Sequence, residues 1–241
     1  MTEFTNEVAI QAWSSIPRQI MEDFGDEGDF VRQHLLNPAI FTLLGDVTGK
    51  TILDAGCGQG YLSRMLARKG ATITGIEPAT QGYTYALQRE QAEPLGITYL
   101  QEDLSTWTPT LSTFDYVIAN MVFMDIPDYL SALHNCIAAL KTGGKLIFSL
   151  LHPCFEEAGS EWQKKGYVEI RDYFQERAVK QTYGYFIHRP LSTYLNSVLQ
   201  EGCSIQNVIE PQLDNTIVLQ HHAERYMHVP GYIVICAIKF S

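Results

Sequence analysis

The strongest constraint on the fold is a short apolar strand that runs through Asp54 into a glycine-rich turn, within residues 51–61 (TILDAGCGQGY). The glycines of this turn allow the backbone to approach a ligand closely. Apolar residues then recur at helical spacing, at Leu62, Met65 and Leu66. A strand, a glycine turn and a helix in this order place the first N–H groups of the helix beside the ligand. We therefore expect an α/β fold with a ligand bound at this turn.

The residues around the turn restrict the kind of ligand. The dinucleotide fingerprint has glycines at its first, third and sixth positions, and counting from Gly56 puts the bulky Tyr61 at the sixth. Asp54 stands two residues before the first glycine, where a carboxylate repels the pyrophosphate of a dinucleotide. A cationic ligand without phosphate is therefore favoured. S-adenosylmethionine meets this description, because it joins an adenosine to an ammonium and a sulfonium group.

Three further strands end in residues that suit the other parts of this ligand. The second strand ends at Glu77, about twenty residues beyond the turn, where a carboxylate accepts hydrogen bonds from ribose hydroxyls. After the third strand, Asp103 is the candidate acceptor for the adenine amino group, and Leu104 packs on the ring. The fourth strand ends at Asn120 and opens onto the apolar Met121, which is expected between cofactor and acceptor. The carboxyl ends of parallel strands face one crevice, so these residues should meet.

Four motifs in this order resemble those of the class I S-adenosylmethionine-dependent methyltransferases: DAGCGQG at 54–60, GIEP at 75–78, QEDL at 101–104 and FDYVIAN at 114–120. The segment TGGKLIFS at 142–149 resembles the family's turn into strand five, so the resemblance covers roughly residues 50–152. The rest of the chain is only loosely similar to the small-molecule branch, through its N-terminal segment and HRPLSTY at 188–194. The resemblance implies S-adenosylmethionine as the cofactor and leaves the methyl acceptor open.

The resemblance also implies a fold and a set of binding residues. The fold is a three-layer, Rossmann-like α/β domain whose seven strands are mostly parallel, with an antiparallel final strand. The cofactor is expected to contact the tips of successive strands, at Asp54, Ala55, Gly56, Cys57, Gly58, Tyr61, Glu77, Pro78, Asp103, Leu104, Asn120 and Met121. Arg32 is a further candidate, as a bidentate partner of the methionine carboxylate, although an exposed arginine needs no such role.

We expect residues 1–241 to form a single methyltransferase domain, because no linker divides the chain. Its expected segments are an N-terminal helical cap (1–48), the cofactor-binding core (49–152), an aromatic insertion on the substrate side (153–190) and a C-terminal helix with closing strands (191–241). The cap covers either the active site or only one face of the sheet. The aromatic residues of the insertion either enclose an acceptor or only pack against one another.

Composition restricts the partners and the compartment. Lys plus Arg number 17 against 27 for Asp plus Glu, a net charge of −10, which argues against a nucleic-acid groove. The five cysteines form no CxxC pair, so a reducing cytoplasm is the simplest setting. Neither a basic segment before an apolar run nor a membrane-spanning stretch is present in the sequence. We expect a soluble monomer or homodimer that acts without a membrane.

Methyl transfer is a displacement on an activated sulfonium, so the protein must mainly align the reactants and exclude water. A general base helps only where the acceptor carries a proton. His152, at the exit of strand five, is the first candidate base, with His188 and Tyr185 as alternatives, although a histidine at a strand end also bonds to backbone. The histidines near the C-terminus match none of the usual zinc spacings, so we predict no metal site at His221, His222, Glu224 and His228.

The predicted function is methyl transfer from S-adenosylmethionine to oxygen or nitrogen of a small metabolite. Three alternatives remain: a methyltransferase acting on RNA, DNA or protein, a nicotinamide-dependent oxidoreductase, and a non-catalytic S-adenosylmethionine-binding protein. The sequence at 120–123, NMVF, lacks the paired prolines of the Asn-Pro-Pro-Phe type used on planar amino groups, and the acidic charge disfavours polyanions. Tyr61 and Asp54 argue against the oxidoreductase, whereas only turnover separates the leading prediction from the non-catalytic binder.

Overall fold

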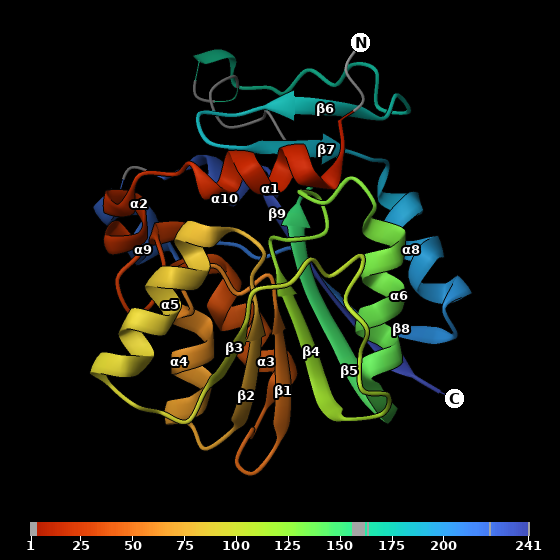
Figure 1. The fold of residues 1–241 in the computed structure, drawn as a ribbon. Coiled ribbons are helices and arrows are strands. Elements are labelled where there is room, and N and C mark those ends of the chain that lie inside the picture. The colour runs from red at the N-terminus through yellow and green to blue at the C-terminus, as the bar shows by residue number, and fades with distance from the viewer. Residues whose placement is uncertain (1–3, 156–161, 163, 222, 241) are drawn as a thin grey trace.

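The computed structural model describes residues 4–155, 162, 164–221 and 223–240. Its centre is a seven-stranded sheet of order β3-β2-β1-β4-β5-β9-β8, flanked by helices on both faces (Figure 1). The strands are β1 (Thr51–Ala55), β2 (Thr72–Ile76), β3 (Thr98–Leu100), β4 (Phe114–Asn120), β5 (Leu140–Leu151), β8 (Cys203–Ile209) and β9 (Tyr232–Lys239). Neighbouring strands from β3 to β5 pair in parallel, whereas β9 is antiparallel to both β5 and β8. The predicted fold class is therefore confirmed, including the antiparallel final strand.

Alternating side chains on the strands build a core on each face of the sheet. Ile52 belongs to one buried cluster and Leu53 to the other, as expected when successive side chains of a strand point to opposite faces. The helices on the Ile52 face are η1 (Arg32–Leu36), α3 (Asn37–Leu44), α4 (Tyr61–Arg68) and α5 (Thr80–Ala92). The Leu53 face is covered by α6 (Tyr129–Ala139) and α8 (Leu191–Gln200). Strands buried on both faces read as the continuous apolar runs that the sequence shows.

The N-terminal helices α1 (Asn6–Ser14) and α2 (Arg18–Asp23) lie across the end of the sheet to which the parallel strands point (Figure 1). A separate hairpin of β6 (Arg177–Lys180) and β7 (Tyr185–His188) lies on the far side of α1. It contacts the helix directly, because Gly184 packs against the Trp13 ring and the rings of Phe4 and Tyr185 lie 4.7 Å apart. The hairpin therefore supports the N-terminal helices from outside.

The chain after β8 returns to the sheet through two short helices, α9 (Asn215–His221) and α10 (Arg225–His228). They form a small apolar cluster with Leu35 of η1. Within the described part of the chain, no helix combines the length and apolar character that crossing a membrane requires.

Candidate cofactor site

The glycine turn that follows β1 requires glycine for steric reasons. Gly56 has φ of 70°, and a Cβ atom there would lie 2.6 Å from a methyl group of Val122. Gly60 has φ of 79° and forms the left-handed N-cap of α4. Within the turn, the Cys57 N–H donates to the carbonyl of Ile76 at 2.9 Å, which fastens the turn to the end of β2. The turn thus brings its backbone close to the loop that follows β4.

A cavity of about 180 Å³ opens above the turn. Its floor consists of strand tips and the glycine turn, and its opposite wall consists of the N-terminal helices. The cap side is mostly apolar and includes Ala9, Ile10, Trp13, Ile16, Ile20 and Phe24. The Nε1 atom of Trp13 is buried and has no hydrogen-bond partner among the described residues. A polar cavity floor beneath an apolar wall suits a ligand that is polar along one edge and apolar along the other.

Two buried carboxyl groups lie at the tips of β1 and β2. The Ser63 hydroxyl donates to Asp54 at 2.5 Å, and burial raises the pKa of Asp54 to about 6 although this bond lowers it. Glu77 accepts from the N–H groups of Gly58 at 2.9 Å and Ala79 at 2.7 Å. Burial raises the pKa of Glu77 to about 7 against these two bonds. Both groups are poorly solvated acids, so a cationic or hydrogen-donating ligand would stabilise their ionised forms.

Asp103 lies after β3 and is held by the first residue of α1. The side-chain amide of Asn6 donates to Asp103 at 3.1 Å and to the Ser105 hydroxyl at 2.6 Å. The same amide accepts from the Asp128 N–H at 2.8 Å through its oxygen. Asn6 therefore ties the N-terminal helix to the loops after β3 and β4 at one point, and it orients the predicted adenine acceptor.

A chain of hydrogen bonds holds the tip of β4. The Ser149 hydroxyl donates to the oxygen of Asn120 at 2.6 Å, and the Asn120 amide donates to the Tyr61 hydroxyl at 2.8 Å. Tyr61 in turn donates to Asn37 at 3.1 Å. The next residue, Met121, has φ of 63° and lines the cavity, so a non-glycine residue is held in a left-handed conformation at the site.

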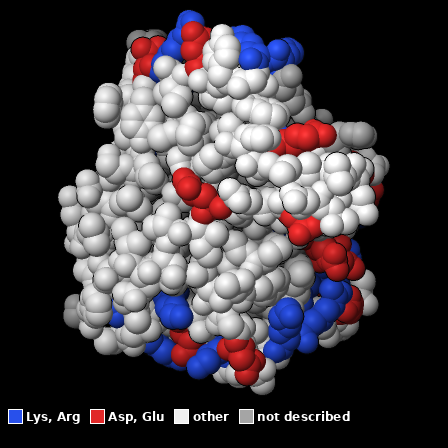
Figure 2. Space-filling view, turned by 180° about the vertical axis from the view of Figure 1, so that it is seen from behind, with Lys and Arg blue, Asp and Glu red and all other residues white. Residues whose placement is uncertain are grey.

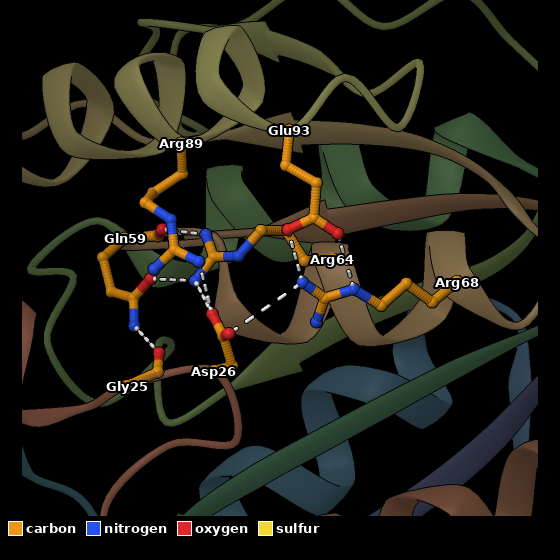
Figure 3. Close-up of polar contacts among 7 residues, drawn as sticks. All are labelled: Gly25, Asp26, Gln59, Arg64, Arg68, Arg89 and Glu93. Atoms are coloured by element: carbon orange, nitrogen blue, oxygen red, sulfur yellow. Dashed lines mark hydrogen bonds and ion pairs between the residues drawn. The ribbon is translucent and has the colours of Figure 1, made fainter.

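A second polar network fastens the glycine turn to the N-terminal segment (Figure 3). The fully buried Arg64 donates to the carbonyl and to the side-chain oxygen of Gln59, at 2.8 and 2.7 Å. The Gln59 amide donates to the carbonyl of Gly25 at 2.9 Å. Asp26 then faces three arginines, with Arg89 at 2.7 Å, Arg64 at 3.5 Å and Arg68 at 3.9 Å. The Gln59 side chain of the turn is thus bonded to the cap.

Most of the predicted cofactor residues come together at this cavity. The wall contains Arg32, Asp54, Gly56, Cys57, Gly58, Tyr61, Glu77, Pro78, Asp103, Leu104, Asn120 and Met121. Ala55 is fully buried in the core beneath the turn and is not in the wall. Arg32 reaches the wall while it is paired with Asp29 at 2.9 Å, and its guanidinium lies over the Phe24 ring.

The three predicted catalytic residues lie elsewhere, which differs from the expectation that they face the cofactor. His152 follows β5, but its Nε2 contacts Glu210 at 3.0 Å, and burial lowers its pKa although Glu210 raises it. His188 bonds the carbonyl of Tyr173 at 2.7 Å, and Tyr185 packs on Phe4. Among the described residues, the insertion contributes none to the cavity wall. The reason is the cap, because α1 lies between the insertion and the strand tips.

Sequence reasoning did not assign several residues of the wall to the site, and among these are Asn6, Trp13 and Asp125. Asn6 and Trp13 stand on an ordinary amphipathic helix, and no local pattern distinguishes them. The sequence did contain a signal for Asp125 as a site residue. It directly follows the apolar run after the tip of β4, where an acidic residue is unusual. Among the described residues, no group of three His, Cys, Asp or Glu side chains is placed to hold a metal ion. His222 lies outside the described residues.

The fold and the site together define a class of protein. Residues 53–148 match the family model described as a methyltransferase domain. Residues 53–148 of the core are therefore a methyltransferase domain, and its strand order and acidic strand tips are those expected where S-adenosylmethionine is the cofactor. The set of wall residues fits this cofactor, since four carboxyl groups and an apolar wall face a cavity beside a helix N-terminus.

Named relatives are similar over part of their length. Ubiquinone biosynthesis O-methyltransferase of Coxiella burnetii (strain Dugway 5J108-111) is 32% identical over 126 residues, which cover 51% of this chain and 54% of the relative. The protein of the same name from Actinobacillus pleuropneumoniae is 34% identical over 134 residues, which cover 52% of this chain and 57% of the relative. The chain therefore spans about half the length of the relatives it matches.

Solved structures are similar in fold over nearly the whole chain. An S-adenosylmethionine-dependent methyltransferase from Mesorhizobium loti has a TM-score of 0.74 at 24% identity and covers 84% of this chain and 96% of its own. The [4+2]-cyclase SpnF has a TM-score of 0.66 at 18% identity, and the match covers 98% of this chain and 96% of the cyclase. Magnesium protoporphyrin IX methyltransferase of Synechocystis PCC 6803, with bound SAH, has a TM-score of 0.60 at 18% identity. The match covers 97% of this chain and 95% of that methyltransferase.

Proposed function

We propose that this chain transfers the methyl group of S-adenosylmethionine to an oxygen or nitrogen atom of a small-molecule acceptor, as one domain formed by residues 1–241. The observation that carries the proposal is the position of α1 and α2 over the strand tips. Their apolar side chains and the acidic tips line one cavity of about 180 Å³. A cavity walled in this way favours a small acceptor over a polymer, and it limits the access of water to the reacting atoms.

The wall residues suit the parts of the cofactor. Asp54 is assigned to the ammonium group, Glu77 to the ribose hydroxyls, Asp103 to the adenine amino group and Arg32 to the methionine carboxylate. Leu104 and Met121 supply apolar contacts beside these polar groups. This arrangement can hold methyl donor and acceptor in line, which is the main contribution that a protein makes to such a displacement.

The named relatives support an oxygen acceptor on a small molecule, because they are ubiquinone biosynthesis O-methyltransferases. Their similarity is confined to about half of each chain, so it supports the class of reaction more strongly than it supports the identity of the acceptor. The general-base roles of His152, His188 and Tyr185 remain predictions, and their positions outside the cavity wall give them no support.

Two other functions remain in competition. A polymer substrate would favour a wide basic surface, yet on the face in Figure 2 lysine and arginine side chains lie among acidic ones and form no continuous basic patch. One of the similar solved structures is named a [4+2]-cyclase, so the same fold also occurs in a protein named for another reaction. A cytoplasmic setting is supported by the five cysteines, which are all free.

Two measurements test the proposal. Calorimetric titration with S-adenosylhomocysteine should show binding to the folded protein. Incubation with methyl-labelled S-adenosylmethionine and a fractionated metabolite extract should then move label into small molecules, with parallel incubations that supply cellular RNA and protein. Label found only in RNA or protein would refute the small-molecule acceptor. Binding without any transfer would favour the non-catalytic alternative.

A further inference from the structure

Asp125 is a cavity residue whose carboxyl group has no hydrogen bond to any residue that the structure describes. It follows the tip of β4, in a turn where its N–H donates to the carbonyl of Val122 at 2.8 Å. The side chain lines the cavity next to the apolar Ile126 and Pro127. An acidic group in such surroundings is costly unless a ligand pairs with it.

The other acidic groups of the cavity differ from Asp125, because each already has a fixed hydrogen-bond donor. Asp54 accepts from Ser63, Glu77 accepts from two backbone N–H groups, and Asp103 accepts from Asn6. These bonds orient each carboxyl group toward one expected part of the cofactor. Asp125 has no such donor, so its oxygens are available to a bound molecule.

When the acidic groups of the cavity are paired with the donor groups of the cofactor, Asp125 has no assigned partner. Among the residues that the structure describes, four carboxyl groups line the wall, at Asp54, Glu77, Asp103 and Asp125, against one guanidinium, that of Arg32. The cofactor offers three sets of donors, which are its ammonium group, its ribose hydroxyls and its adenine amino group, and one carboxylate for Arg32. The first three acids match the three sets of donors. The fourth acid therefore faces whatever else enters the cavity.

We propose that Asp125 binds the O–H or N–H group of the methyl acceptor and takes its proton during transfer, which rests on the proposed function. The acceptor oxygen or nitrogen forms a bond to the methyl carbon, the bond from sulfur to that carbon breaks with its electron pair on sulfur, and the proton passes to a carboxylate oxygen of Asp125. The acceptor is therefore a neutral or cationic hydroxyl or amine compound. A carboxylate beside the reacting atom would be repelled.

The surroundings suit Asp125 to this task. Burial raises the pKa of its carboxyl group, Arg32 lowers it and Glu77 raises it further. A base whose pKa is raised from its usual value holds the acceptor proton more firmly near neutral pH. These two residues are the charged groups of other segments that act on it.

The test compares Asp125→Asn and Asp125→Glu with the matched control Asp128→Asn. Asp128 caps α6 by accepting from the Ser131 N–H, a role that asparagine fills equally well, and it is not part of the cavity wall. Each variant is titrated with S-adenosylhomocysteine, melted at about pH 8, and assayed for label transfer to the metabolite fraction that the wild type methylates.

Asp125→Asn should lower label transfer by about 100-fold or more, the usual contribution of a general base. Its S-adenosylhomocysteine affinity should stay within about twofold of wild type, and its melting temperature should rise, because a half-buried carboxylate without a hydrogen-bond partner is removed. Asp125→Glu should restore part of the rate with a shifted pH profile, and Asp128→Asn should behave as wild type.

Unchanged transfer by Asp125→Asn would overturn the inference and leave the methyltransferase function intact. Weaker S-adenosylhomocysteine binding would also overturn it, since Asp125 would then be a cofactor residue. A lower melting temperature with lower transfer would show a structural role instead. Absence of small-molecule labelling by the wild type would remove both the proposed function and this inference.

Discussion

Replacing Asp26 by asparagine tests whether the N-terminal cap and the glycine turn act together. Asp26 lies in the cap and contacts Arg89 at 2.7 Å and Arg64 at 3.5 Å (Figure 3). Asparagine keeps the shape and the oxygen acceptor but removes the charge. The side chains of α1 and α2 form one wall of the cavity, so a displacement of the cap would open the cavity on that side.

The size of the effect follows from the exposure of the partners. Asp26 is 47% exposed and Arg89 28% exposed, and a pair of this kind contributes at most about 1 kcal/mol. Arg64 is 0% exposed, and two charges at about its distance from Asp26 attract by about 4 kcal/mol before desolvation is subtracted. Arg64 keeps its two bonds to Gln59 in the variant. We therefore expect a net loss of about 1–2 kcal/mol from the closed cap.

A loss of this size corresponds to about a 5–30-fold change in the opening equilibrium. Stopped-flow displacement of S-adenosylhomocysteine should show release faster by that factor in Asp26→Asn. Affinity should change less than release if the closed cap remains the dominant state. The control is Glu93→Gln, which removes the 2.7 Å ion pair with Arg68 in the same network but has no contact with the cap. Equal release rates for the two variants would refute the reasoning.

Further predictions concern the acidic strand tips and Asn6. Replacing Asp54 or Glu77 by alanine should weaken S-adenosylmethionine binding about tenfold or more by calorimetry, because a buried charged hydrogen bond is lost. The affinity should also fall as the pH is lowered from about 8 to about 5.5, since the pKa values of about 6 and about 7 mean that both acids become protonated in the free protein. Both pKa values are raised on folding, so the unliganded protein should lose thermal stability as the pH rises from about 5 to about 7; a rise in melting temperature would contradict this. Asn6→Asp should weaken binding more than Asn6→Ala, because a second carboxylate would face Asp103.

Much of the cofactor site could be predicted because its signals are local. The glycine turn, the acidic residue after β2 and the acidic residue after β3 each stand next to a strand, and parallel pairing brings strand ends to one edge. The mostly parallel sheet and the antiparallel β9 followed from the resemblance to the family. These features depend on residues within a few positions of each strand, which a sequence displays directly.

The cap and the catalytic side could not be predicted in the same way. The contact of Asn6 with Asp103 spans 97 positions, and it depends on where α1 settles on the sheet. Histidine is a reasonable residue type for a general base. The His152 ring is bound instead by Glu210, which lies 58 positions further along the chain. Asp125 is an aspartate in a short turn, and only the cavity around it gives its carboxyl group a role. Tertiary contacts decided each of these outcomes.

The glycine turn has two separate tasks, and its residue types divide between them. The backbone of Gly56 and Gly58 faces the cavity, where side chains would obstruct the ligand or strike Val122. Gln59, between Gly58 and Gly60, uses its side chain to join Gly25 of the cap to Arg64 of α4. A shift of the cap must therefore pull on the turn that holds the cofactor. Gln59 is therefore the residue that couples the position of the turn to the position of the cap.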